Sequence, residues 1–374
     1  MRAVSARLAP VLAAVLVTAL AGCSQGGDEI NVEIQGDGST VQGSASADAS
    51  GPGPEVVDTI ATGLEVPWGI GFLPNGDAVV TERDTAKVLT ITGSDHTVTE
   101  VGTVGDAAPQ GEGGLLGVAV SPAYDQDKKL YFYASGETDN RIVTATLEDG
   151  VLSATKPIFT GIPLGAIHDG GRLAFGPDGM LYASTGETGD GPLAQDLDSL
   201  GGKILRLTPK GKPAPGNPFD TAVWSFGHRN VQGLAFAEDQ LWASEFGQST
   251  FDELNRIEPG SNYGWPEVEG TGGVDAGFTD PQATWSTDVA SPSGLAYAEG
   301  ALWMAALRGN RLWKIPVTDQ QAGQPEAYFV GDYGRMRTVV VAPDGNLWVT
   351  TSNQDGRGDP SDDDDQVLVV DPAP

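Results

Sequence analysis

The chain has 374 residues, of which 21 are basic and 51 acidic, and its formal charge is −30. This balance argues against nucleic acid as a partner and against electrostatic attraction to anionic lipid. A single cysteine excludes a disulfide within the chain and a cysteine zinc cluster.

The amino-terminal segment 1–22 is typical of a secretory signal, because two arginines precede an apolar run too short to span a bilayer comfortably. The run ends in Leu-Ala-Gly-Cys, which resembles the cleavage box of bacterial lipoproteins. We therefore expect Cys23 to be lipidated; the alternative is an ordinary signal with an unpaired thiol. Residues 23–54 are expected to form the lipidated cysteine and a flexible linker, since they are rich in Gly, Ser, Asp and Ala.

Residues 55–374 contain a phrase that recurs six times: a small apolar strand, a turn rich in Pro, Asp, Asn or Gly, and a second strand. The equivalent anchor positions are Phe72, Val120, Phe175, Phe236, Tyr297 and Val341. Their separation suits about four short strands per repeat, the size of one propeller blade. Helical periodicity is almost absent, and alternating apolar and polar residues are frequent. The sequence predicts an all-β, six-bladed β-propeller, with the anchor strands near the axis.

Candidate site residues precede the repeat strands, where loops would converge at the channel mouth. His168 comes before the third repeat strand, and Glu187 lies just beyond the following hairpin, within reach as a carboxylate partner. Arg229 and Asn230 hold the corresponding place before the fourth strand.

Further arginines and acids follow. Arg335 and Arg337 alternate along an extended segment and should share one face. With Arg229 and Arg308 they predict an anion pocket. The carboxylate-rich stretch containing Glu245, Asp252, Glu253 and Asn262 is a weak calcium candidate, without EF-hand spacing. The acidic run 362–365 is interpreted as a solvated loop, with weak calcium attraction as the alternative.

Six phrases, in chain order, resemble the soluble quinoprotein glucose/sorbosone dehydrogenases, which include the aldose sugar dehydrogenases. They are "QGEGGLLGVAVSP", "HDGGRLAFGPDG", "AQDLDSLGGKILRL", "FGHRNVQGLAF", "DELNRIEPGSNYGWP" and "GRMRTV". The resemblance implies a six-bladed propeller that binds pyrroloquinoline quinone (PQQ) and Ca²⁺, oxidises the anomeric hydroxyl of an aldose sugar to a lactone, and passes electrons to an external acceptor. It also implies a monomer or a dimer.

Carried over by position, the resemblance makes His168 the general base and Glu187 the acid that assists it. Arg229 would polarise the reacting quinone carbonyl, with Asn230 beside it, and Arg335 and Arg337 would grip the cofactor carboxylates. Calcium would be held by the carbonyls of Gly247 and Gln248, and in a second site by Glu253 and Tyr263.

Four positions depart from the family pattern. Glu112 replaces a substrate-contacting glutamine and is expected to add a negative charge near the mouth. Arg308 replaces a cofactor-binding lysine, Gln248 a proline, and Phe246 a polar residue. The expected protein is a dehydrogenase lying outside the cytoplasm and anchored to the bacterial membrane through its lipid alone. The alternatives are a non-catalytic propeller that binds carbohydrate or a partner protein, and a calcium-dependent lactonase.

Overall fold

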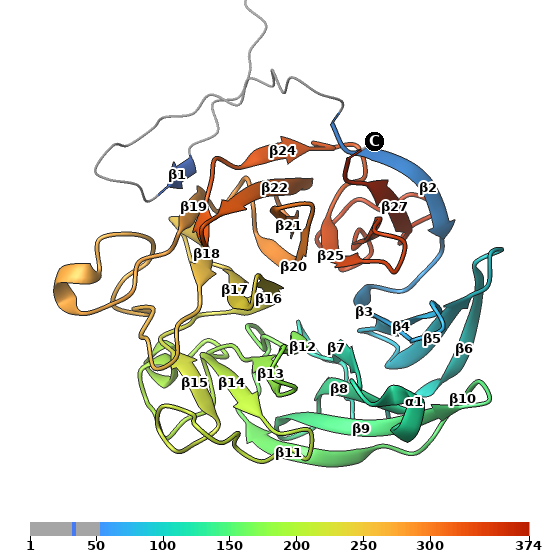
Figure 1. Ribbon diagram of the computed structural model, residues 1–374, viewed down its shortest axis with the longest axis horizontal. Coiled ribbons are helices and arrows are strands. Elements are labelled where there is room, and N and C mark those ends of the chain that lie inside the picture. Colours follow the sequence, from blue (N-terminus) through green and yellow to red (C-terminus); the bar gives the residue numbers. More distant parts are fainter. Residues whose placement is uncertain (1–31, 35–52, 374) are drawn as a thin grey trace, which may run out of the picture.

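The computed structural model describes residues 32–34 and 53–373. These residues form a ring of six antiparallel sheets around a central axis, as Figure 1 shows. Helical structure within the described ranges is confined to α1 (Tyr124–Asp127) and two 3-10 turns, η1 (Gly191–Ala194) and η2 (Val274–Ala276). The predicted six-bladed β-propeller is confirmed.

Each of the first three blades has four main strands running from the axis outward. Blade one contains β3 (Pro67–Phe72), β4 (Ala78–Glu82), β5 (Lys87–Thr92) and β6 (Thr97–Thr103). Blade two contains β7 (Leu115–Val120), β8 (Lys129–Ser135), β9 (Asn140–Glu148) and β11 (Lys156–Ile162), with β10 (Val151–Leu152) also paired to β9. Blade three contains β12 (Leu173–Phe175), β13 (Leu181–Ser184), β14 (Lys203–Leu207) and β15 (Val223–Phe226).

The remaining blades repeat this order. Blade four contains β16 (Val231–Ala237), β17 (Gln240–Glu245), β18 (Phe251–Arg256) and β19 (Ala283–Ser286). Blade five contains β20 (Pro292–Ala298), β21 (Ala301–Ala306), β22 (Arg311–Thr318) and β24 (Glu326–Tyr328), with β23 (Gln321–Ala322) also paired to β22. Blade six contains β25 (Met336–Val341), β26 (Leu347–Thr351), β27 (Val367–Asp371) and β2 (Glu55–Ala61). All six anchor residues named above lie in the innermost strand of their blade.

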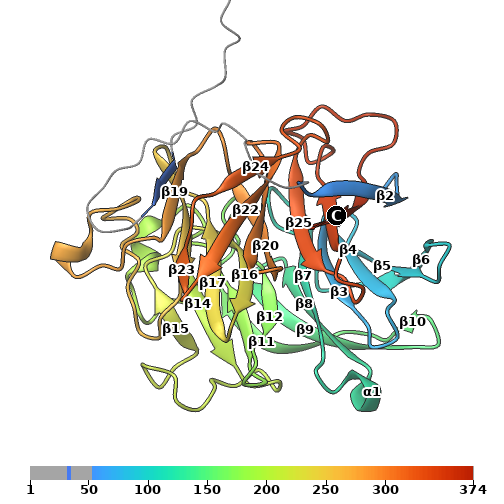
Figure 2. The same ribbon diagram turned by 45° about the horizontal axis from the view of Figure 1, so that its top comes forward.

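The ring is closed by the two ends of the folded body. Strand β2 pairs antiparallel with β27, with Glu55 opposite Asp371 and Ala61 opposite Val367. Figures 1 and 2 show β2 along the outer edge of the blade that carries the C-terminal end. Because the last blade takes its outer strand from the start of the domain, the circle needs no further element to hold it shut.

The amino-terminal expectations fall largely outside the described residues. The signal segment 1–22 and Cys23 lie outside them. Within the stretch expected to be a linker, Val32–Ile34 form β1, which pairs antiparallel with β19 and adds a fifth strand to blade four.

Large apolar side chains fill the spaces between neighbouring blades. Trp242, Trp285 and Trp313 are at most 1% exposed and belong to one cluster shared by blades four and five. One four-stranded sheet cannot bury both of its faces alone, so each blade is stabilised by its two neighbours. The alternating pattern seen in the sequence therefore serves contacts between blades.

The inner strands approach one another closely at one repeated position, three residues before each anchor. It is glycine in four blades, and a Cβ on Gly117 or Gly233 would lie 2.3 Å or less from a neighbouring atom. The other two blades have Arg172 and Thr338 there. Arg172 donates to Thr338 Oγ1 at 3.2 Å, to Gln232 O at 2.8 Å and to Trp68 O at 3.4 Å. The axis is thus filled by a buried guanidinium, whose pKa burial lowers to about 9.

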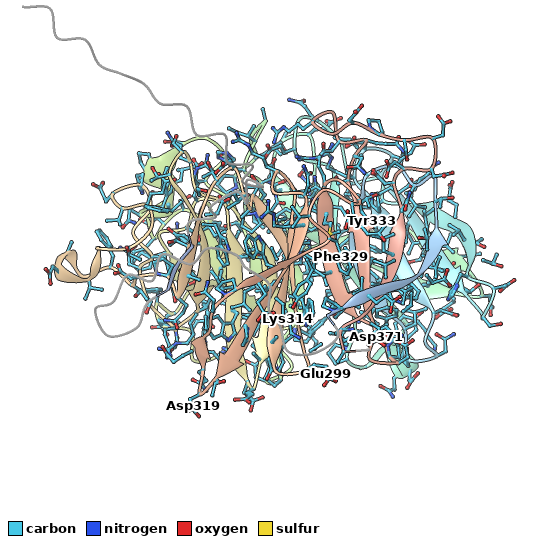
Figure 3. All side chains as sticks on the ribbon, turned by 90° about the horizontal axis from the view of Figure 1, so that it is seen from above. Glu299, Lys314, Asp319, Phe329, Tyr333 and Asp371 are labelled. Carbon is cyan, nitrogen blue, oxygen red and sulfur yellow. The ribbon has the colours of Figure 1, made fainter. Side chains whose placement is uncertain are left out.

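Strand alternation determines which loops share a face. Hairpins after the first and third strands of a blade lie on one face, and loops after the second and fourth strands lie on the other. Figure 3 shows this from the edge of the ring: Tyr333, before β25, lies toward one face, and Glu299 and Asp319, in the hairpins of blade five, lie toward the opposite one. The loops that carry His168, Glu187, Arg229, Gly247, Arg308 and Arg335 belong to the Tyr333 face.

Candidate functional site

A cavity of about 760 Å³ opens among the loops of this face. Every blade contributes to its lining. The residues come from the loops entering the inner strands of blades two to six and from the loops after the second strands of blades one, four, five and six. The lining includes eight of the predicted site residues: Glu112, His168, Arg229, Asn230, Gly247, Arg308, Arg335 and Arg337. Residues from distant parts of the chain therefore converge as the propeller geometry predicted.

His168 occupies the loop between β11 and β12 in a left-handed backbone conformation, with φ of 58°. Its ring Nδ1 lies 2.5 Å from Glu187 Oε1, and Glu187 is only 2% exposed. The loop is also held to Glu187 through the backbone, since Thr188 N donates to His168 O at 3.2 Å. A carboxylate at Nδ1 accepts a hydrogen bond from Nδ1–H, so the neutral ring keeps its proton there and Nε2 has a free lone pair. The pair can act as an oriented base.

Arg229 and Asn230 enter the cavity from the loop between β15 and β16. The Arg229 backbone N–H donates to Glu245, whose other oxygen lies 2.9 Å from His228 Nδ1. The guanidinium of Arg229 lies over the Trp265 ring, 5.4 Å from its centroid, and burial lowers its pKa. Asn230 Oδ1 accepts the N–H of Gly170, which follows the base by two residues. These contacts join the Arg229 loop to the His168 loop.

Arg335 and Arg337 share one carboxylate that the sequence interpretation missed. Asp355, between β26 and β27, accepts from Arg335 Nη2 at 2.8 Å and from Arg337 Nη2 at 3.1 Å. Burial would raise the pKa of Asp355, but the two guanidinium groups lower it. The two guanidinium groups lie on one face as expected, and both already bind one carboxylate of the protein.

More cationic than acidic side chains line the cavity. Six arginines line the cavity, Arg83, Arg229, Arg308, Arg335, Arg337 and Arg357, against the two carboxylates Glu112 and Asp355. Within the described part of the chain, Arg229 Nε is buried and has no hydrogen-bond partner. A flat polyanion therefore fits this donor set.

The predicted calcium residues do not all reach the cavity. Gly247 lines it, whereas Gln248, Glu253 and Tyr263 do not. Glu253 is 8% exposed, and its oxygens accept from Gly270 N and Asn255 Nδ2. Burial raises the pKa of Glu253 to about 8, and the negative charge of Glu245 is the second cause. In the described ranges, no group of three or more His, Cys, Asp or Glu side chains is arranged to hold a metal ion.

Backbone amides shape the loop that carries Gly247 and Gln248. Glu269 Oε1 accepts four consecutive N–H groups, from Gln248, Ser249, Thr250 and Phe251, at 2.7 to 3.1 Å. These four bonds lower the pKa of Glu269 against the effect of burial. One side chain therefore organises the backbone of this loop.

Glu112 places an ionised carboxylate in the cavity lining, as expected. The sequence did not reveal its partner: Arg357 Nη2 lies 2.7 Å from Glu112 Oε1. Arg357 lies outside every motif in the sequence, as do Arg83 and Asp355. Only their place in loops of the cavity face reveals them.

The interpretation of residues 362–365 as a solvated loop is wrong for two of the four residues. Asp362 and Asp363 are exposed, but Asp364 and Asp365 are 7% and 0% exposed. Asp365 Oδ1 accepts Asn353 N at 2.5 Å, and Asp364 Oδ1 accepts Asn353 Nδ2 at 2.9 Å. These two carboxylates close the base of the loop that carries Asp355 and Arg357.

Comparisons with known proteins agree with this geometry. The pattern of the Glucose / Sorbosone dehydrogenase family matches residues 64–359. The structure of the PQQ-bound form of Aldose Sugar Dehydrogenase from Streptomyces coelicolor is 55% identical, covers 85% of this chain and 97% of that one, and superposes with a TM-score of 0.83. Aldose sugar dehydrogenase YliI of Escherichia coli is 29% identical over 80% of this chain and 91% of its own length. Quinoprotein glucose dehydrogenase B of Acinetobacter calcoaceticus is 32% identical over 56% of this chain and 52% of its own length.

No helix among the described residues is long and apolar enough to cross a membrane.

Proposed function

Since this chain belongs to the glucose/sorbosone dehydrogenase family, we propose that it is a PQQ- and calcium-dependent oxidoreductase that converts the anomeric hydroxyl of an aldose to a lactone. The observation that carries the proposal is the position of the oriented His168–Glu187 pair in a cavity lined by six arginines. A base and an anion clamp in one cavity are what a quinone-dependent oxidation of an alcohol needs.

The residues present suit the cofactor. Arg308, Arg335 and Arg337 would hold the carboxylates of PQQ, and Arg229, with Asn230 beside it, would face its reacting carbonyl. The cofactor, when bound, supplies the carbon that accepts a hydride, and calcium supplies Lewis acidity at the quinone oxygen. Carbonyls of Gly247 and Gln248 would hold that calcium, and Glu253 and Tyr263 a second one. The buried carboxylate of Glu253 is of a kind that a cation would stabilise.

The side chains of the protein have separate roles in the oxidation of the sugar. His168 Nε2 removes the proton of the anomeric hydroxyl, and Glu187 holds the ring through Nδ1 and stabilises the imidazolium that forms. The two electrons would leave with the anomeric hydrogen as hydride, for which PQQ would be the acceptor, and an external acceptor would take them up afterwards. Trp265 and the loops around it hold the Arg229 guanidinium against one side of the cavity.

The test is to express residues 24–374, add PQQ and Ca²⁺, and follow reduction of an artificial dye with a panel of aldoses. We expect turnover only when both additions are present, and its loss when a chelator removes calcium. His168→Ala should lower kcat by about 10²-fold or more while PQQ binding, followed by its absorbance, persists. Turnover unchanged in this variant would exclude His168 as the base.

We also propose that the protein acts outside the cytoplasm, attached to the bacterial membrane through a lipid on Cys23. The Leu-Ala-Gly-Cys box supports this location. The net charge of −30 gives no electrostatic attraction to anionic lipid, which is consistent with attachment through the lipid alone.

A further inference from the structure

Glu112 is the meeting point of three loops at the cavity. Its backbone N–H donates to Ala166 O at 3.0 Å, and its Oε2 accepts the backbone N–H of His168 at 3.0 Å. Its Oε1 pairs with Arg357 of blade six. Burial would raise the pKa of Glu112, but the His168 N–H and the Arg357 charge lower it below its usual value. Both oxygens of an ionised carboxylate are therefore engaged by the protein beside the base.

Arg357 is held in place by a structured loop. Its backbone N–H donates to Asp355 Oδ1 at 3.0 Å, and Asp355 is fixed by Arg335 and Arg337. The base of this loop is closed by Asp364 and Asp365. The Arg357 side chain is nevertheless 61% exposed and lines the cavity. A guanidinium has five N–H donors in a planar fork, so it can hold Glu112 and still meet a ligand.

We propose, building on the dehydrogenase function above, that Arg357 is a specificity-determining residue that sets the charge preference of the sugar subsite. By pairing with Glu112 it neutralises the carboxylate next to the base, and its guanidinium faces the cavity in place of that negative charge. The subsite then takes neutral and anionic aldoses, such as hexuronic acids, and disfavours cationic amino sugars.

The size of the effect follows from Coulomb's law. With an effective dielectric constant of about 40, between that of a protein surface and that of bulk water, a unit charge about 6 Å from an ionic substituent changes the binding of that substituent by about tenfold. Because Arg357 is more exposed than Glu112, whose side chain is 19% exposed, added salt should weaken the contribution of the arginine.

The experiment compares kcat/KM for glucosamine, glucose and glucuronate at low ionic strength, at a pH where the first is cationic and the last anionic. The loaded wild type should prefer glucuronate to glucosamine. Arg357→Gln should raise the ratio of glucosamine to glucuronate by about tenfold, and Glu112→Gln should lower it. The double variant should return toward the wild-type ratio, and high salt should shrink every shift. Lys87→Gln on blade one, which removes the same charge from a surface pair with Glu100, is the matched control and should leave the ratio unchanged.

Other outcomes overturn the proposal. A wild type that prefers glucosamine would contradict it. An equal fall of kcat/KM for all three sugars in Arg357→Gln would also contradict it, because the residue would then only stabilise the loop structure. If no sugar reduces the dye in any variant, the dehydrogenase proposal is the one that fails. The charge preference is then read by isothermal titration of the three sugars against the PQQ-loaded proteins. The same order of affinities is expected, and its absence excludes the role of Arg357.

Discussion

Asp169 is a buried carboxyl group next to His168 in the chain. It is 2% exposed, and its Oδ1 accepts Asn140 Nδ2 at 2.8 Å and Gly165 N at 3.1 Å. Its Oδ2 is buried and has no hydrogen-bond partner among the described residues. Burial raises the pKa of Asp169 to about 6, against the lowering effect of these two hydrogen bonds. The group keeps its proton in the folded state at a pH where the unfolded chain has released it.

The pH dependence of stability follows from this shift. Between about pH 4 and pH 6 the folded state binds the proton that the unfolded state has lost, so the free energy of unfolding falls as pH rises, by up to about 2 to 3 kcal/mol. Asp169→Asn keeps an oxygen for Asn140 and Gly165 and has no such titration. We expect the stability of the variant relative to wild type to increase from pH 4.5 to pH 7.5 in urea unfolding. A constant difference across this range would contradict the raised pKa.

Residue identities in the site were predictable where they belong to motifs, and not elsewhere. The sequence indicated His168 and Glu187, and their contact follows from the hairpin that separates them. Asp355 and Arg357 could not be found in this way, because their partners Arg335 and Glu112 lie 20 and 245 residues away in the sequence, by subtraction of residue numbers. Spacing along a chain carries no signal for such pairs.

At the scale of elements, β2 is the strand whose pairing partner, β27, lies furthest away in the sequence. It supplies the outer strand of blade six, and within it Ile60 and Ala61 are 8% and 6% exposed. Deleting residues 1–52 leaves this strand intact, whereas deleting residues 1–61 removes it and exposes the edge of β27. We expect the longer deletion to lower the free energy of unfolding by about 3 kcal/mol or more and to promote aggregation.

Thermal unfolding of the two truncated proteins, with light scattering to follow aggregation, makes the comparison. The shorter deletion is the control: it removes the three-residue β1 from the edge of blade four but keeps β2, and its Tm should stay closer to that of residues 24–374 than the Tm of the longer deletion does. Equal Tm values for both truncations would show that blade six is stable without β2.

At the scale of the whole molecule, the proposed lipid on Cys23 would give the amino-terminal segment a task separate from that of the folded body. If that lipid is the attachment, we expect the full chain to fractionate with membranes and Cys23→Ser to appear in the soluble extracytoplasmic fraction with unchanged dye reduction. Ser24→Ala, next to the cysteine, is the control and should stay with the membrane. Membrane association that survives loss of the cysteine would point to another anchor.

The sequence by itself determined the number of blades, because each blade is a local unit whose strands alternate and whose turn residues recur. It also indicated His168, Arg229 and Arg335, which stand before inner strands, and Glu187 and Arg308, which follow the second strands of their blades. Only the tertiary structure decided how charges balance in the cavity: that Arg335 and Arg337 share Asp355, that Arg357 neutralises Glu112, and that Arg172 fills the axis. The physical reason is that closing a ring brings together loops from all six blades. Electrostatic pairing depends on distance in space, and a repeat specifies each blade without specifying which side chains meet its neighbours across the axis.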